Sequence, residues 1–176
     1  MNNKSKNTLR MLGIALLVLV LDQGTKYWVR TRLTLRETVT PIPALSSFFR
    51  IIHWKNTGVA FGMFQGQGWL IALIALVILV LLTVYFRQGP ETPLYWQIAV
   101  GMQLGGALGN LLDRLMLGYV VDFLWFGDFP VFNIADAAIV FGAAVLVIGL
   151  TADEKREKET AAVKETEAET TETEEA

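Results

Sequence analysis

The sequence predicts an all-α membrane protein with four transmembrane helices. Between the first two helices we expect a small outer-face cap of short strands and an amphipathic segment. Hydrophobic residues make up 53% of the 176 residues and charged residues only 18%, against about 25% charged in an average soluble domain. The apolar residues are gathered in segments long enough to cross a bilayer. These observations exclude an ordinary soluble globule, a disordered protein and a nucleic-acid-binding protein.

Four apolar segments account for the predicted spans. The first resembles the start of a secretory signal peptide but lacks a small-x-small cleavage site. The second is apolar apart from Thr83 and is about 27 Å long as a helix. The third repeats small residues at every fourth position, which lets helices approach closely in lipid. These residues are Gly101, Gly105 and Gly109. We predict the spans at about residues 9–29, 69–86, 94–117 and 132–150.

The chain divides into one membrane domain and a tail. Residues 1–150 form the predicted four-span domain, with the cap at residues 30–68. Residues 151–176 hold 10 of the 17 acids, so we predict an acidic cytoplasmic tail that is disordered or loosely helical. With four spans both termini lie on one side, and the larger share of basic residues favours the cytoplasm as that side. We expect the cap to rest on the membrane surface, with Arg36 and Arg50 near lipid phosphates.

Polar residues gather at one predicted membrane face. Four of the seven acids outside the tail lie in or beside apolar segments, and the order of the spans places all four at the outer face. A carboxylate costs about 2.5–3.5 kcal/mol at the centre of a membrane helix, so this cluster requires a function. Two neighbouring carboxylates share a proton; one can accept a proton from water while the other protonates the leaving group, as in aspartic peptide hydrolysis. The acids are Asp22, Asp113, Asp122 and Asp136, joined by Asn56, Asn110 and Asn133.

Other chemistries and structural roles were weighed against this interpretation. The sequence has no cysteine and a single histidine, His53, which excludes a Cys nucleophile, Cys-ligated metals and a multi-His metal site. We expect no metal and no cofactor, and we interpret His53 as an interfacial residue. Asp22 and Lys26 are four residues apart and can form a structural ion pair. Asp113 and Arg114 can likewise belong to a structural network.

Five stretches of the chain carry a family resemblance. They are Asp22-Gln-Gly-Thr-Lys26, Asn56-Thr-Gly-Val-Ala-Phe-Gly62, Gly105-Gly-Ala-Leu-Gly-Asn-Leu-Leu-Asp-Arg114, Val120-Val-Asp-Phe123 and Phe132-Asn-Ile-Ala-Asp136. In this order they resemble the motifs of bacterial lipoprotein signal peptidase, or signal peptidase II, over about residues 9–150. Gly24 departs from the pattern, because a larger residue is expected there.

The resemblance implies an aspartic endopeptidase of the bacterial cytoplasmic membrane. Its substrates are prolipoproteins that already carry diacylglycerol on a cysteine, and it cuts just before that cysteine. The catalytic pair maps to Asp122 and Asp136, with Asp113 as the second choice for a catalytic carboxylate. We expect a multi-pass monomer in contact with membrane lipids, with cytoplasmic termini and an active site near the outer face. Supporting and substrate-binding roles map to Asp22, Lys26, Asn56, Asn110, Asp113, Arg114 and Asn133.

Three other functions compete with peptide hydrolysis. A small transporter or ion channel also uses intramembrane Asp and Asn residues, but here they cluster at one face instead of lining a path. An enzyme acting on lipid phosphates would use Arg114 and the basic cap, yet it lacks a cluster of His, Lys and Arg near the carboxylates. A scaffold protein would leave Asp122 and Asp136 without a role.

Overall fold

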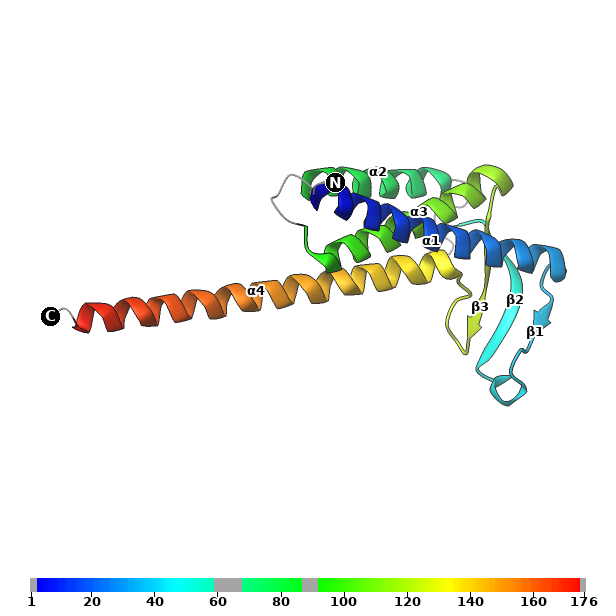
Figure 1. Ribbon diagram of the computed structural model, residues 1–176. Coiled ribbons are helices and arrows are strands. Elements are labelled where there is room, and N and C mark those ends of the chain that lie inside the picture. Colours follow the sequence, from blue (N-terminus) through cyan, green and yellow to red (C-terminus); the bar gives the residue numbers. More distant parts are fainter. Residues whose placement is uncertain (1–2, 59–67, 87–91, 175–176) are drawn as a thin grey trace.

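The computed structural model describes residues 3–58, 68–86 and 92–174. Four helices form a bundle, and a small sheet lies at one end of it (Figure 1). Both termini lie toward the opposite end, and the last helix extends well beyond the other three. The elements are α1 (Asn3–Arg32), β1 (Thr38–Val39), the 3-10 turn η1 (Pro43–Leu45), β2 (Phe49–Asn56), α2 (Gly68–Phe86), α3 (Leu94–Leu117), β3 (Val120–Phe126) and α4 (Ile134–Glu174).

The helices occupy the segments predicted as spans. Two helices in the described part of the chain, Asn3–Arg32 and Ile134–Ala161, are long and apolar enough to cross a membrane. Helices α2 and α3 begin and end within a residue of the predicted bounds 69–86 and 94–117. The protein is therefore mostly helical with two candidate membrane spans, and the arrangement with four spans stays a prediction.

Glycines allow α3 to pack closely against both of its long neighbours. A methyl group added at Gly105 would lie 2.5 Å from the carbonyl oxygen of Ala15 on α1. One added at Gly106 would lie 2.5 Å from the carbonyl oxygen of Ala135 on α4. Contacts this short are not tolerated by real side chains, so the small residues predicted to pack in lipid do bring the backbones together. Helix α3 is thereby the centre of the bundle and carries part of the candidate site.

The sheet has three antiparallel strands in the order β1-β2-β3. Thr38 pairs with Ile52, and Arg50 pairs with Trp125, with an irregularity between Ile51 and Trp54. The expectation of a cap confined to residues 30–68 was incomplete, because β3 comes from the segment between α3 and α4. That segment, Val-Val-Asp-Phe-Leu-Trp-Phe, is rich in β-branched and aromatic residues, which favour strands. Asp122 therefore lies on a strand.

Of the two states predicted for the C-terminal segment, the structure has the helical one. Helix α4 continues through the predicted tail to Glu174. The composition offers a physical reason, because Ala, Glu and Lys are strong helix formers. Two ion pairs at four-residue spacing support the exposed helix, Lys158 with Glu154 at 2.7 Å and Lys155 with Glu159 at 3.8 Å.

Candidate active site

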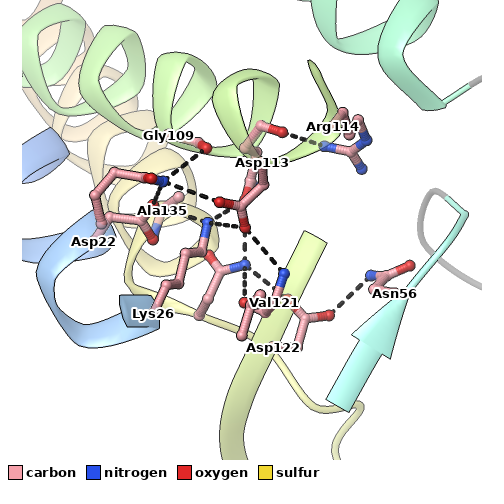
Figure 2. Close-up of polar contacts among 12 residues, drawn as sticks. Asp22, Lys26, Asn56, Gly109, Asp113, Arg114, Val121, Asp122 and Ala135 are labelled. Atoms are coloured by element: carbon pink, nitrogen blue, oxygen red, sulfur yellow. Dashed lines mark hydrogen bonds and ion pairs between the residues drawn. The ribbon is translucent and has the colours of Figure 1, made fainter. Parts of the chain in front are cut away.

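The nine residues predicted for the site lie together where the bundle meets the sheet. Figure 2 shows Asp22, Lys26, Asn56, Asp113, Arg114 and Asp122 among them. The nine residues come from five elements far apart in sequence, and hydrogen bonds and ion pairs join all of them into one network. Helix α1 supplies Asp22 and Lys26, the end of β2 supplies Asn56, α3 supplies Asn110, Asp113 and Arg114, β3 supplies Asp122, and the start of α4 with the residue before it supplies Asp136 and Asn133.

A buried lysine lies between two buried carboxylates. The Lys26 side chain is 1% exposed, and its Nζ lies 2.8 Å from Oδ2 of Asp22 and 3.2 Å from Oδ2 of Asp113. The predicted contact between Asp22 and Lys26 is confirmed. Asp113 and Arg114 both belong to the polar network, as the sequence allows, but they contact different partners, because consecutive residues of a helix point in different directions. Arg114 instead donates to the backbone oxygens of Asn110 and Gly58, both at 3.2 Å.

The same two carboxylates hold the backbone next to Asp122 and Asp136. Val121, which precedes Asp122, donates its backbone N–H to Oδ2 of Asp113 at 3.0 Å. Ala135, which precedes Asp136, donates its backbone N–H to Oδ1 of Asp22 at 2.9 Å. Asp113 therefore holds β3, and Asp22 holds the start of α4. Each contact lies one residue away from a candidate catalytic side chain.

Gln23 also belongs to the site, although the sequence did not single it out. Its Nε2 lies 3.1 Å from Oδ1 of Asp113, 3.1 Å from the carbonyl oxygen of Gly109 and 3.2 Å from Oδ2 of Asp22. Gln23 lies in the motif Asp22–Lys26, and this position beside Asp22 is the only feature of the sequence that points to a role in the site. With Gln23 at Oδ1 and Lys26 and Val121 at Oδ2, both oxygens of Asp113 are occupied by donors.

Three asparagines direct their amide nitrogens at Asp122 and Asp136, and a donor on the oxygen side orients each amide. Lysine can only donate, so its Nζ, 3.0 Å from Oδ1 of Asn110, turns Nδ2 of Asn110 toward Oδ1 of Asp136 at 2.7 Å. The backbone N–H of Gly58 donates to Oδ1 of Asn56, whose Nδ2 then donates to Oδ2 of Asp122 at 2.9 Å.

Asn133 joins the two candidate catalytic residues. Its Oδ1 accepts the backbone N–H of Asp136 at 2.9 Å, and its Nδ2 donates to Oδ1 of Asp122 at 2.7 Å. Its own backbone N–H points back to Oδ2 of Asp136 at 3.3 Å. This reciprocal arrangement is a capping interaction at the first turn of α4, where a negative charge is favoured by the helix dipole.

Asp122 and Asp136 have different surroundings. Asp122 is 1% exposed, whereas Asp136 is half-buried. Burial, together with the negative charge of Asp136, raises the pKa of Asp122 to about 7, although the amides of Asn56 and Asn133 oppose the rise. The Asp122 carboxyl is therefore partly protonated near neutral pH. Two neighbouring carboxyls, one giving a proton and the other accepting one, can serve as a general acid and a general base.

The remaining candidates lie outside this network. Nδ1 of His53 donates to the carbonyl oxygen of Leu33 at 2.9 Å, so this buried ring ties β2 to the end of α1. Within residues 3–58, 68–86 and 92–174, no three His, Asp or Glu side chains are grouped so that they could hold a metal ion. Chemistry without a metal or cofactor stays a prediction.

Comparison with known proteins identifies the family. Signal peptidase (SPase) II matches residues 14–152 of the chain. A lipoprotein signal peptidase of Moorella thermoacetica is 43% identical over 136 residues, which cover 77% of this chain and 88% of the relative. One of Syntrophomonas wolfei is 39% identical over 153 residues, which cover 87% of this chain and 100% of the relative.

Solved structures agree with this assignment. A bacterial membrane enzyme determined by the in meso method at 2.3 Å resolution superposes with a TM-score of 0.73 and 34% identity, covering 82% of this chain and 88% of its own. A second, determined by the same method at 1.9 Å resolution, superposes with a TM-score of 0.69 and 34% identity, covering 80% of this chain and 91% of its own. The chain therefore belongs to the signal peptidase II family of lipoprotein signal peptidases and is a protease.

Proposed function

We propose that this protein removes the signal peptide from diacylglyceryl-modified prolipoproteins, cutting just before the lipidated cysteine. Asp122 and Asp136 activate a water molecule for this hydrolysis. One observation carries the proposal: two electrostatically coupled carboxylates, one fully buried, accept hydrogen bonds from side-chain amides whose orientations are set elsewhere in the network. Asp113 is a weaker candidate, because its carboxylate is paired with the buried ammonium of Lys26 and holds the backbone N–H of Val121.

The surroundings of the two acids suggest how the reaction proceeds. Ionised Asp136 accepts a proton from water, and the resulting hydroxide attacks the carbonyl carbon of the scissile peptide bond. The proton on Asp122 passes to the carbonyl oxygen, which gives a tetrahedral gem-diol. When this species collapses, Asp136 returns its proton to the leaving amine of the cysteine. Asp122 recovers a proton from the diol, so the pair ends with the one proton it had at the start.

The supporting residues have positions that fit this scheme. Asp22 and Asp113 hold the backbones that carry the two acids, and Lys26 lies between them. Arg114 donates to the backbone of Gly58, two residues beyond Asn56. We assign Asn56 to the substrate side of the site, because it reaches Asp122 from the sheet and not from the bundle.

The proposal includes a topology. All four helices span the cytoplasmic membrane of a bacterium, both termini are cytoplasmic, and the site lies near the outer face. The chain acts as a monomer on substrates held in the same bilayer by their signal helix and acyl chains. Because the sheet and the termini lie at opposite ends of the bundle, the site and the termini fall on opposite sides of the membrane (Figure 1).

A gel-shift assay tests the reaction. Purified protein in detergent is mixed with a diacylglyceryl-modified prolipoprotein and, separately, with the unlipidated form. We expect loss of the signal peptide from the lipidated substrate alone. Asp122→Asn should abolish cleavage, whereas Asp128→Asn, the same change at an exposed turn, should not. Cleavage that survives in Asp122→Asn but is lost in Asp113→Asn would move the catalytic pair to Asp113 and Asp136.

A further inference from the structure

A cleft on the sheet is not used by the proposed reaction. It has a volume of about 260 Å³ and is open to the surroundings of the protein. Two tryptophans and an arginine form most of its wall, and a hydroxyl and two aliphatic side chains complete it. The lining residues are Thr38, Arg50, Ile52, Trp54, Trp125 and Val131.

The cleft offers a positive charge with free donors. The guanidinium of Arg50 lies 4.5 Å from the centre of the Trp125 ring, and its Nε donates to the carbonyl oxygen of Ser46 at 2.7 Å. These two contacts hold the side chain in place. Within the described residues its terminal amino groups have no acceptor or carboxylate partner, so they can donate to a ligand.

The charge around the cleft is not neutralised by the cap. Residues 30–68 contain five basic residues and one acid, Glu37; β3 and the turn after it add Asp122, which belongs to the active-site network, and Asp128, so basic residues still outnumber acids. Glu37 is occupied locally, because it accepts the backbone N–H of Thr34 at 2.7 Å and the Thr34 hydroxyl at 2.9 Å. Arg36 adds a further cation 5.8 Å from the centre of the Trp54 ring. The complementary ligand is therefore an anion.

The outer end of the sheet is apolar and exposed. Large hydrophobic side chains project from the connection between β1 and β2 and from the turn after β3, with 43–64% of their surface exposed. Such residues are unfavourable in water but suit the boundary between head groups and acyl chains. They are Ile42, Leu45, Phe48 and Phe129.

An extended peptide is a poorer occupant than a lipid. A peptide that adds to a sheet needs a free strand edge. At one edge β1 is only two residues long. At the other edge Phe132 already exchanges hydrogen bonds with Leu124, at 2.8 and 3.0 Å, and accepts one from Phe123. Neither edge offers a long run of free backbone groups.

From these observations we infer that the cleft binds the phosphate of an anionic membrane phospholipid, with the guanidinium of Arg50 against the phosphate and the lipid acyl chains beside the apolar end of the sheet. This lipid is distinct from the diacylglyceryl group of a substrate, whose link to cysteine contains no phosphate. The inference rests on the membrane location of the protein and not on its peptidase chemistry, so the two can fail independently.

Tryptophan quenching tests the site in the full chain. The protein is reconstituted in phosphatidylcholine vesicles that contain a minor fraction of either dibrominated phosphatidylglycerol or dibrominated phosphatidylcholine. The signal of Trp125 is the difference between the wild type and Trp125→Phe. We expect phosphatidylglycerol to quench this signal at lower mole fractions than phosphatidylcholine does. Arg50→Gln should weaken the apparent affinity for phosphatidylglycerol about tenfold or more, the effect of losing a hydrogen bond to a charged group.

Lys55→Gln is the matched control. Lys55 lies on the same strand and carries the same charge, but it stacks on Tyr119 at 4.6 Å and does not line the cleft. We expect its affinity for phosphatidylglycerol to equal that of the wild type. An equal loss in both variants would overturn the inference, because it would reveal only diffuse attraction to an anionic surface. Displacement of the lipid by an acidic peptide would assign the cleft to a polypeptide, and displacement by inorganic phosphate would assign it to a free anion. Melting temperatures confirm that each variant is folded.

Discussion

Replacing Lys26 with methionine should destabilise the protein severely. Methionine has a similar length, so the substitution removes the ammonium while leaving little empty space. The change leaves two carboxylates, Asp22 and Asp113, without the cation that lies 2.8 and 3.2 Å from them. Both carboxylates are buried. Removing one partner of a buried ion pair costs about 3–5 kcal/mol, because an uncompensated charge remains.

The expected loss can be expressed as a melting temperature. For a chain of this size about 1 kcal/mol corresponds to roughly 2–4 °C, so Lys26→Met should lower the melting temperature by roughly 6–20 °C. Differential scanning fluorimetry of the purified protein in detergent measures the shift. The exposed Lys55→Met, the same substitution on β2, should change it by less than about 2 °C.

A second substitution tests whether charge causes the loss. In Lys26→Met with Asp113→Asn, one of the two unpaired carboxylates is gone, so part of the stability should return. The two changes would then be non-additive, as expected for residues in contact. The argument from the buried cation would be refuted if Lys26→Met had the melting temperature of the wild type. It would also be refuted if the loss of stability in the double variant equalled the sum of the losses in Lys26→Met and Asp113→Asn.

Three further predictions concern the pair of acids, the helix packing and the asparagines. Burial and the charge of Asp136 raise the pKa of Asp122 to about 7, so kcat/KM for a lipidated substrate should fall as the pH rises above about 7. The contribution of Asp122 to stability should be fully present below its ordinary pKa of 3.8 and be lost as the pH rises through about 7. Flat profiles of rate and of stability between pH 5 and 9, roughly two units either side of the raised pKa, would contradict both expectations. Gly105→Ala should lower the free energy of unfolding by about 1–3 kcal/mol, measured by thermal unfolding, since the new methyl group would lie 2.5 Å from a backbone oxygen. Gly24→Ala meets nothing within 4 Å and should be neutral or stabilise by about 0.5–1 kcal/mol. Equal effects would show that the close approach of α1 and α3 does not determine the cost of the added methyl group. Asn56→Ala removes an amide that donates to Asp122. Because that hydrogen bond lowers the pKa of Asp122, the alkaline limb of the pH–rate profile should move to higher pH. A lower rate with an unchanged profile would assign Asn56 to substrate binding alone.

Much of this protein could be predicted from local sequence. Apolar segments define the bounds of α2 and α3 to within a residue, because the length of a membrane span follows directly from bilayer thickness. The two strands within residues 30–68 also follow the expectation of a small folded cap. The motif residues were identified individually, and their roles stay predictions.

Other features depended on partners distant in sequence. The strand β3 pairs with β2 about 70 residues away in sequence, so nothing adjacent to it in the chain reveals the pairing. Gln23 was missed for the same reason, because its three acceptors include Gly109 and Asp113 on another helix. The adjacency of Asp113 and Arg114 suggested a shared network, but not the separate partners that each one contacts.

The sequence by itself determined the class of the protein, its helical segments and the polar residues that require an explanation. A bilayer requires long apolar segments and penalises the charged groups among them, and both features are visible in the local sequence. Only the tertiary structure decided what those polar residues do for one another. It placed Lys26 between two carboxylates, used those carboxylates to hold the backbone beside Asp122 and Asp136, and turned three amides toward them. The physical reason is that a hydrogen bond depends on ångström-scale distances between groups on different elements, and packing alone sets those distances.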